Sequence, residues 1–262
     1  MSKPRRETGD GRREWPGRAG LLSALLLGTL GMRMGGAPGP LGPGGAPVAA
    51  SVDSVERALM LRTGIARLQY DGGGDWYANP SSLGNLLKAV NERTSLRVEP
   101  TEGRITLTDD KLYDYTFLHA TGHGVIKFSD AEVTRLREWL LRGGFLHVDD
   151  NYGLDETFRK EIARVFPDRP LTDVPLSHPI YHVVYDFPKG VPKIHEHDGK
   201  AARGYGIFIG DRLAVYYTHE TDLGNGWEDV GTYANDPPEL HETALRMGVN
   251  LVVYAITSRP VQ

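Results

Sequence analysis

The sequence predicts an α/β domain of three layers, with helices on both faces of a parallel sheet. Between residues 64 and 166, short apolar runs typical of buried strands alternate with amphipathic helical patterns. This order, with short connections, indicates parallel βαβ units with right-handed crossovers. No internal repeat and no linker interrupts residues 51–262. We therefore expect residues 51–262 to form a single domain.

Recognisable start and stop signals bound the first elements. Asp53 and Glu56 have the spacing of a helix N-terminus, so a short helix is expected up to Leu61. An apolar run over residues 65–70 predicts a strand, and the Gly-rich residues 71–76 predict the turn that ends it.

A helix and two short strands are expected after this turn. Apolar residues at helical spacing over 83–90 predict the helix, with Ser81 or Ser82 as its cap. Residues 96–98 predict a short second strand, and residues 104–108 predict an edge strand or a hairpin.

The middle of the chain repeats the strand–helix order. Residues 115–120 and 145–149 predict strands that are buried on both faces. A helix is expected between these two strands. Ser129 and Glu132 form a capping box at its start, and Gly143-Gly144 ends it. That helix is expected to point four apolar side chains inward, namely Val133, Leu136, Leu140 and Leu141.

The pattern changes in the second half. Residues 150–153 predict a turn, and residues 154–166 predict another amphipathic helix. Strand-like runs separated by Gly/Pro loops then follow at 181–187, 206–210 and 213–218, before a long helix from Glu239 to Thr257. We therefore expect a β-rich C-terminal elaboration of the domain, spanning residues 170–235.

The first fifty residues have the features of an export signal rather than of the fold. A basic segment precedes the apolar run 19–31, which is too short to cross roughly 30 Å of hydrocarbon comfortably. Residues 35–47 are almost all Gly, Pro and Ala, and small residues before Ser51 offer a cleavage site. Arg12-Arg13 resembles a twin-arginine signal, and a chance arginine pair is the alternative. An uncleaved run would act as a membrane anchor.

Composition and charge exclude several classes of function. The chain contains no Cys, which excludes disulfides, zinc–thiolate sites and a cysteine nucleophile. Residues 51–262 carry 23 Lys and Arg against 31 Asp and Glu, a net charge of -8. Such an acidic domain lacks the charge that neutralises phosphates, so nucleic acid is not an expected partner. Membrane contact is expected only through an uncleaved N-terminal segment.

Polar residues gather where the predicted strands end. Ligands bind beyond the carboxyl ends of the strands in an open parallel sheet, so we expect these segments to share one rim. The candidates for catalysis are Asp149, Asp150 and His123. The candidates for ligand binding are Asp71, Asp75, Trp76, Thr121, Gly122, Gly124, Asn151, Asp222, Trp227 and Glu228.

Each candidate also has a structural interpretation. Residues 149–151 could form only a turn with an Asx cap on the next helix. His123 could be a loop histidine that bonds to the backbone. Trp76 and Trp227 could stack on a sugar or peptide, or only hold their loops in place.

The other histidines are less specific. His119 and His147 lie inside predicted strands and are expected to be core histidines. The segment 195–198 could supply two imidazoles, His195 and His197, to a divalent metal. A solvated loop is the favoured interpretation, because the spacing fixes no third ligand. No serine lies in a G-x-S-x-G elbow, so an α/β-hydrolase triad is not expected.

Five segments together resemble the motif set of an exported bacterial family classed as domain of unknown function 4159. The segments are 70–76, 121–124, 143–150, His178-Pro179 and 222–228, and the resemblance covers most of residues 64–258. This family is similar in layout to class I glutamine-amidotransferase-like domains, including the trehalose-utilisation type. The resemblance implies a three-layer, flavodoxin-like or glutamine-amidotransferase-like fold.

The same resemblance implies where a site would lie. Residues 149–151 would occupy the neighbourhood of the nucleophile, and residues 121–124 would lie near the oxyanion hole. Because the chain has no cysteine, amidotransfer through a thiolate is excluded. The resemblance therefore implies a fold and a site location, but no reaction.

Two functions from different classes remain. The first is a non-catalytic module of the cell envelope that binds a small polar ligand, a glycan or a protein partner, and the missing nucleophile favours it. The second is a hydrolase that uses Asp149, Asp150 and His123, with or without a divalent metal, and the density of acids and imidazoles at the strand ends favours it. A purely structural envelope protein is a third possibility.

The predicted export signal can be tested directly. Because signal sequences are removed after export, mass spectrometry of the native protein is expected to find a chain that starts near Ser51. A chain with an intact Met1 in the cytoplasmic fraction would contradict the prediction.

Overall fold

A seven-stranded sheet of order β2-β1-β3-β4-β7-β6-β5 organises the part of the chain that the structure describes. The structure is a computed structural model, and it describes residues 64–197, 199–233 and 237–258. The strands are β1 (Gly64–Leu68), β2 (Gly103–Ile105), β3 (Tyr115–His123), β4 (Phe145–Tyr152), β5 (Thr172–Asp173), β6 (Arg203–Ile209) and β7 (Arg212–His219).

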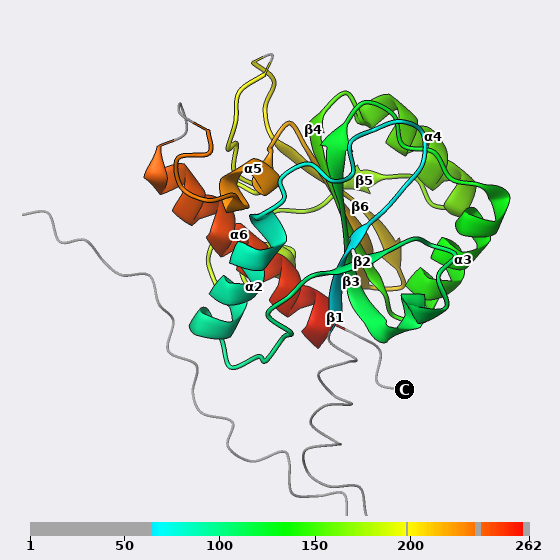
Figure 1. The fold of residues 1–262 in the computed structure, drawn as a ribbon, viewed down its shortest axis with the longest axis horizontal. Coiled ribbons are helices and arrows are strands. Elements are labelled where there is room, and N and C mark those ends of the chain that lie inside the picture. Colours follow the sequence, from blue (N-terminus) through cyan, green and yellow to red (C-terminus); the bar gives the residue numbers. More distant parts are fainter. Residues whose placement is uncertain (1–63, 198, 234–236, 259–262) are drawn as a thin grey trace, which may run out of the picture. The chain divides into compact units, whose positions relative to one another are not determined.

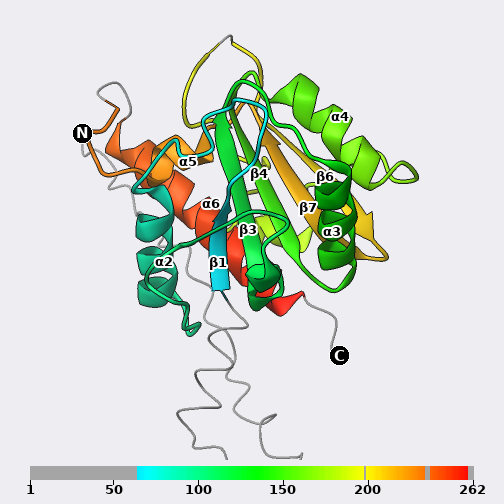
Figure 2. The same ribbon diagram turned by 45° about the vertical axis from the view of Figure 1, so that its right-hand side comes forward.

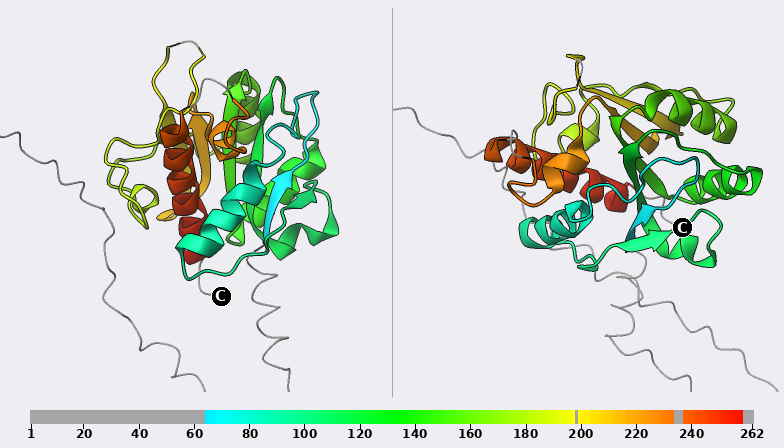
Figure 3. Two further views of the ribbon diagram at one scale, coloured as in Figure 1. Left: turned by 60° about the vertical axis from the view of Figure 1, so that its left-hand side comes forward. Right: turned by 45° about the horizontal axis from the view of Figure 1, so that its top comes forward.

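Helices cover both faces of this sheet (Figure 1). The α-helices are α2 (Ser82–Arg93), α3 (Asp130–Leu141), α4 (Asp155–Val165), α5 (Leu223–Trp227) and α6 (Pro238–Thr257), and two 3-10 turns are η1 (Asp110–Asp114) and η2 (Pro179–Tyr181). Helices α2, α5 and α6 lie on one face, and α3 and α4 lie on the other (Figure 2). Figure 3 shows α2 beside α6 on their common face, where the two helices pack together.

The sheet is mostly parallel, but it is mixed. Strands β2, β1, β3, β4 and β7 run parallel, while β6 and β5 pair antiparallel at one edge. The predicted α/β class is confirmed. The sheet that was predicted as parallel is mixed, because β5 and β6 of the expected C-terminal elaboration join it as antiparallel strands. The antiparallel edge arises because β6 and β7 are joined by a tight turn at Gly210 and Asp211, which reverses the chain.

One hydrophobic cluster lies on each face of the sheet. The first joins α2, α5 and α6 to the sheet through residues such as Leu86, Phe145 and Met247. The second joins α3 and α4 to the sheet through residues such as Leu136, Val148 and Phe158. Both faces are thus covered, which explains why β3 and β4 are buried along nearly their whole length.

Most local signals predict the observed elements. The capping box is present, since the Ser129 hydroxyl accepts from the Glu132 N–H and Glu132 accepts from the Ser129 N–H. One inward assignment in this helix is wrong, because Leu141 is 45% exposed while Trp139 is buried in its place. The turn expected at 150–153 is also displaced, because β4 continues through Tyr152 and only Gly153 turns.

Two predicted strands do not form. Residues 96–98 are irregular, and the Asn91 side chain exchanges two hydrogen bonds with the backbone of Val98. Residues 181–187 form the end of η2 and a series of bends. Here Asn250 of α6 accepts from the N–H groups of Val184 and Tyr185. In both cases a side chain satisfies backbone groups that a strand partner would otherwise bond.

The N-terminal predictions fall outside the described residues. These are the export signal, the Gly/Pro-rich segment 35–47 and the helix expected at 53–61. Within the described part of the chain, none of the helices combines the length and apolar character needed to cross a membrane.

A buried arginine fixes the loop that follows β1. Arg67 is 1% exposed, and its guanidinium donates to the carbonyls of Ala78 and Asn79 and pairs with Glu102 at 3.1 Å. These bonds tie the loop before α2 to the edge of the sheet. The loop is thereby positioned close to the strand ends that form the candidate site.

We expect Arg67→Met to lower the free energy of unfolding by about 3 kcal/mol or more, because it removes the buried guanidinium that donates to the carbonyls of Ala78 and Asn79 and that pairs with Glu102. The matched control is Arg104→Met, since Arg104 pairs with the same Glu102 but is 57% exposed. That change is expected to cost less than about 1 kcal/mol. Urea unfolding of both variants measures the difference, and equal costs would contradict this role of Arg67.

Candidate functional site

The strand order reverses between β1 and β3, which makes their carboxyl ends the expected ligand crevice of this sheet. His123 ends β3, and its Nδ1 lies 3.1 Å from Oδ2 of Asp75, in the loop after β1. The backbone N–H of His123 donates to the other oxygen of Asp75. The imidazole is 51% exposed, so Asp75 holds a half-exposed ring in a fixed orientation.

The glycine before this histidine is required by close packing. Gly122 has φ of +141°, and a Cβ there would overlap the Tyr70 hydroxyl and Asp75. The Tyr70 hydroxyl in turn donates to the Thr121 carbonyl at 3.0 Å. Gly122 therefore lets the loops after β1 and β3 touch. Gly124 follows with φ of +87°, and its N–H points to the Tyr152 carbonyl at 3.4 Å.

Asp149 lies fully buried at the end of β4, on the face that carries α5. Its Oδ1 accepts from the hydroxyls of Thr218, at 2.5 Å, and Thr221, at 3.1 Å, and its Oδ2 accepts from the Gly224 N–H at 2.7 Å. Burial raises the pKa of this carboxyl, and the hydrogen bonds oppose that effect. Asp149 thus anchors the end of β7 and the start of α5.

Asp150 points to the opposite face, because successive side chains alternate along a strand. Its Oδ1 accepts from the N–H of Leu154, the residue that precedes α4, and its Oδ2 accepts from the Tyr217 hydroxyl at 3.1 Å. Burial raises its pKa as well. The Asx-type capping interpretation therefore accounts for Asp150.

The three catalytic candidates do not form one cluster. Asp149 and Asp150 serve different faces of the sheet, and each already accepts bonds on both oxygens. His123 pairs with Asp75 rather than with either of them. The predicted convergence is thus corrected by the alternation of side chains along β4.

A polar cluster surrounds Gly224 instead. The position of a Cβ on Gly224 would lie 2.8 Å from Asn79 Nδ2, 3.3 Å from Asp149 Oδ2 and 3.4 Å from Thr121 Oγ1. The Thr121 hydroxyl donates to Asn151 Oδ1 at 2.9 Å. We call Asn79, Thr121, Asp149 and Asn151 the Gly224 cluster. Its members come from three separate segments, the loop after β1, β3 and β4, which meet at the rim.

Asp222 lies beside this cluster, two residues before Gly224. It has a left-handed backbone with φ of +56°, and His197 Nε2 lies 2.5 Å from its Oδ2. Burial, together with the charges of Asp149 and Asp150, raises the pKa of Asp222 to about 9. Burial and the nearby His195 lower the pKa of His197. At neutral pH we therefore expect the Asp222–His197 pair to be uncharged overall.

Tyr152 covers the same region from the end of β4. Its ring stacks on His197 with centroids 4.9 Å apart, and the residue is 51% exposed. Because Tyr152 follows Asn151 and His197 bonds Asp222, this stacked pair spans the gap between the cluster and Asp222. His197 belongs to the loop that rises above the strand ends between η2 and β6 (Figure 2).

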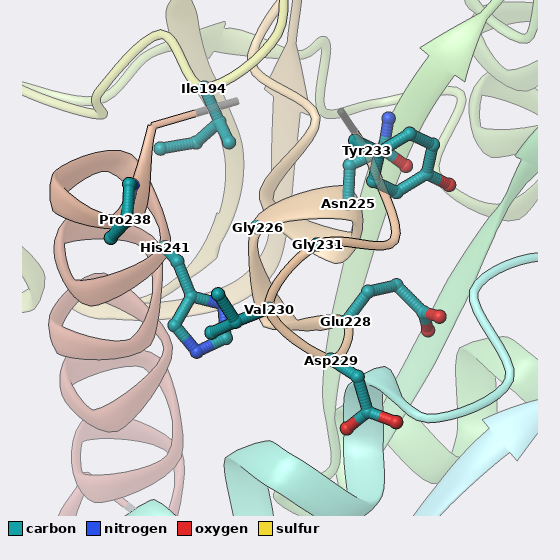
Figure 4. Close-up of a pocket in the computed structure, with 10 residues that line it drawn as sticks. All are labelled: Ile194, Asn225, Gly226, Glu228, Asp229, Val230, Gly231, Tyr233, Pro238 and His241. Carbon is teal, nitrogen blue, oxygen red and sulfur yellow. The ribbon is translucent and has the colours of Figure 1, made fainter. Parts of the chain in front are cut away.

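A pocket adjoins the cluster on the side of α6 (Figure 4). Asn225 and Tyr233 line it on one side, while Pro238 and His241 of α6 lie across from them. The Tyr233 hydroxyl donates to Asn79 Oδ1 at 2.7 Å, so Tyr233 is shared by the pocket and the Gly224 cluster. Tyr233 therefore connects the wall of the pocket to the buried amide of Asn79.

Four buried side chains around α5 each have one polar atom without a hydrogen-bond partner. The atoms are Asn79 Nδ2, Asn151 Nδ2, Asp222 Oδ1 and Asn225 Oδ1. Exposure of these residues ranges from 0% to 7%. A buried polar atom without a partner costs about 1–3 kcal/mol, so such atoms are normally rare.

The remaining predicted ligand residues have structural roles. Trp227 is fully buried, and its indole N–H donates to the Ala244 carbonyl, so the structural interpretation accounts for it. Glu228 accepts from the N–H groups of Ser81 and Ser82 at 2.9 Å and thereby caps α2. Ser81 is the N-cap residue of α2, as expected, but its side chain makes no capping hydrogen bond, and Glu228 takes that role.

Two further candidates lie away from the cluster. Trp76 is partly buried against the α3–α4 side of the core and meets Tyr77 edge to face at 5.6 Å. Asp71 is exposed, and its backbone carbonyl accepts from the Lys127 N–H. Neither side chain lies among the residues that surround Gly224.

A pair of core histidines lies beneath the site. His119 and His147 are fully buried, and their Nδ1 atoms are 3.0 Å apart. Burial lowers the pKa of both rings, that of His147 to about 3. His147 Nε2 contacts Thr218 Oγ1, which donates to Asp149. Both rings are therefore neutral and form a polar chain that ends at the buried carboxylate.

The described residues offer no ligand set for a metal ion. No group of three or more His, Asp or Glu side chains in the described ranges is arranged to hold one. In the segment 195–198, His197 is instead engaged by Asp222 and Tyr152. A divalent metal thus stays a prediction without a ligand set.

Sequence reasoning missed Asn79, Tyr152, Tyr233 and Asn225. Asn225 lies inside the 222–228 motif, and the Gly on each side of it indicated close packing of the backbone. Asn79 carries φ of +56°, which Asn tolerates better than most residues, but nothing local indicates that conformation. Tyr233 joins Asn79 across 154 residues, a contact that only the fold creates.

The raised pKa of Asp222 leads to a pH dependence of stability. Since the folded pKa of about 9 exceeds the ordinary value of 3.8 for an Asp carboxyl, the folded state holds an extra proton between these values. Stability from this group is therefore lost as the pH rises toward 9, by up to about 1.4 kcal/mol per pH unit.

We expect Asp222→Asn to remove this dependence and to be more stable than wild type by an amount that grows between about pH 7 and pH 9. Asn also tolerates the left-handed backbone at this position. Urea unfolding across this range measures the effect, and Asp71→Asn is the exposed control. Parallel pH profiles for wild type and Asp222→Asn would rule out the assignment.

Comparisons with known proteins place the chain by family alone. A comparison with curated proteins finds no match. A family model described as "Domain of unknown function (DUF4159)" matches residues 64–256. This range begins with β1 and ends within α6, so it includes all seven strands and the Gly224 cluster. Because the match covers more than half of the sequence, the chain belongs to the DUF4159 family.

Proposed function

We propose that this domain is a non-catalytic module that binds a small polar ligand beside α5, at the carboxyl ends of the strands. The observation that carries the proposal is the set of four unpartnered buried atoms on Asn79, Asn151, Asp222 and Asn225. Their combined cost is relieved if a ligand supplies the missing hydrogen bonds. The pocket beside Tyr233 supports a route of entry.

Two further proposals concern the setting of this site. The parallel strands β2, β1, β3, β4 and β7 follow the order of doubly wound flavodoxin-like sheets, which supports a flavodoxin-like, glutamine-amidotransferase-like arrangement. We also propose that the protein is exported to the periplasm or cell envelope, on the basis of its N-terminal sequence. A glycan or an envelope protein remains within the proposed ligand classes.

The engagement of the acids favours binding over hydrolysis. Asp149 and Asp150 accept hydrogen bonds that hold α5 and α4 in place, so neither is free to act on a substrate. One observation favours the hydrolase as a second candidate. Asp75 orients His123 through Nδ1 and leaves Nε2 turned away from it, as in a general base with an orienting carboxylate.

The binding proposal is tested by thermal unfolding with five small polar probes. They are a sugar (glucose), an amino acid (glutamine), a dicarboxylate (malate), a nucleoside (adenosine) and a polyamine (spermidine). A probe at ten times its Kd stabilises the folded state by about 1.4 kcal/mol and raises Tm by about 3–6 °C. We expect at least one probe to do so. Asn151→Asp is expected to abolish the shift, because it keeps the shape and the Thr121 bond but replaces the free donor with an acceptor.

The control is Asp71→Asn, an exposed position outside the cluster, which is expected to leave the shift unchanged. Absence of a shift with every probe, or an identical shift in Asn151→Asp, would contradict the binding site. Turnover of a bound probe that is lost in His123→Asn would favour the hydrolase instead.

A further inference from the structure

The charges around the site disfavour an anionic ligand. Asp149 is fully buried beside Asp222, whose own pKa is raised to about 9 by burial and by the charges of its neighbours. Glu220 lies nearby in the chain, and the two lysines near it, Lys193 and Lys200, are engaged by its carboxylate at 3.2 and 3.7 Å. An added carboxylate or phosphate would therefore meet acids rather than free cations.

The unpartnered atoms call for a ligand that both donates and accepts hydrogen bonds. Asn79 and Asn151 each leave an amide N–H group without an acceptor, whereas Asp222 and Asn225 each leave an oxygen without a donor. An ammonium group offers only donors and a carboxylate only acceptors, so each would leave half of the set unsatisfied. A hydroxyl group does both, and adjacent hydroxyls do so at several points.

An aromatic surface lies at the mouth of the same site. Tyr152 is half-exposed and directly follows Asn151, and its ring is covered by His197 at a centroid distance of 4.9 Å. His197 also occupies one oxygen of Asp222. Displacing this one imidazole would thus free both a flat apolar ring and a buried carboxyl group. A ligand with a ring and several hydroxyls would use both surfaces.

We propose that the ligand is a neutral saccharide whose ring stacks on Tyr152 in place of His197 and whose hydroxyls reach Asn151 and Asp222. This inference rests on the proposed binding function and names its ligand class.

Isothermal titration calorimetry of the full chain tests the inference with glucose, galactose and N-acetylglucosamine, beside glucuronate, which keeps the ring of glucose and carries a carboxylate. We expect at least one neutral sugar to bind and glucuronate to bind at least about tenfold more weakly. Tyr152→Ala is expected to weaken sugar binding about fivefold to tenfold, while Tyr152→Phe retains it, because stacking needs the ring and not the hydroxyl. Both changes are at an exposed side chain, so folding is expected to persist, and circular dichroism checks it.

A second readout follows the displaced imidazole. NMR signals of the His197 ring are expected to shift when the sugar is added, and those of His178, which packs against Phe208 and Tyr254 away from the site, are the internal reference. Failure of every neutral sugar, equal binding of glucuronate, or equal binding by Tyr152→Ala would overturn the saccharide assignment. If glutamine or adenosine then binds in a manner that depends on Asn151, the binding function stands and only its ligand class fails. Sugar binding that Asn151→Asp leaves intact would overturn both.

Discussion

The buried carboxylate of Asp149 is the constraint on which the site depends. It gathers two threonine hydroxyls from the end of β7 and the N–H of Gly224 from the first turn of α5. The chain between these points passes through two left-handed residues, Glu220 and Asp222, and such backbone persists only where the surroundings hold it. Because a buried carboxylate is costly without donors, the three bonds and the position of α5 require one another.

Because side chains alternate along β4, neighbouring residues point to opposite faces of the sheet and have different roles. Asp149 faces α5 and Asp150 faces α4, so two acids that look like a catalytic pair in the sequence perform two separate anchoring tasks. Asn151 then turns to Thr121, and Tyr152 reaches the surface and stacks on His197. One short segment therefore holds a helix on each face of the sheet and also presents the polar and aromatic groups of the rim.

The sequence allowed the local elements to be predicted because their causes are local. The capping box of α3 and the apolar runs of β3 and β4 act over a few residues, and they form as expected. The strands predicted at 96–98 and 181–187 do not form, because the side chains of Asn91 and Asn250 hydrogen-bond the backbone there. Nothing within those two segments indicates these bonds. The sequence predicted that the candidate site would lie at the strand ends. Which side chains meet there depends on contacts such as Tyr233 with Asn79, which arise only from the assembled fold.

The polar side chains at the strand ends form two sets that differ in their hydrogen bonding. Bonds that hold the fold are saturated at Asp149, Asp150 and Glu228, whereas the unpartnered atoms lie on Asn79, Asn151, Asp222 and Asn225, between those anchors. The anchors fix the positions of groups whose own hydrogen bonds are incomplete. A ligand that completes them would stabilise the connection between β7 and α5, so occupancy and the order of that segment would be coupled. The free energy that the unpartnered atoms cost would then contribute to the affinity of the proposed ligand.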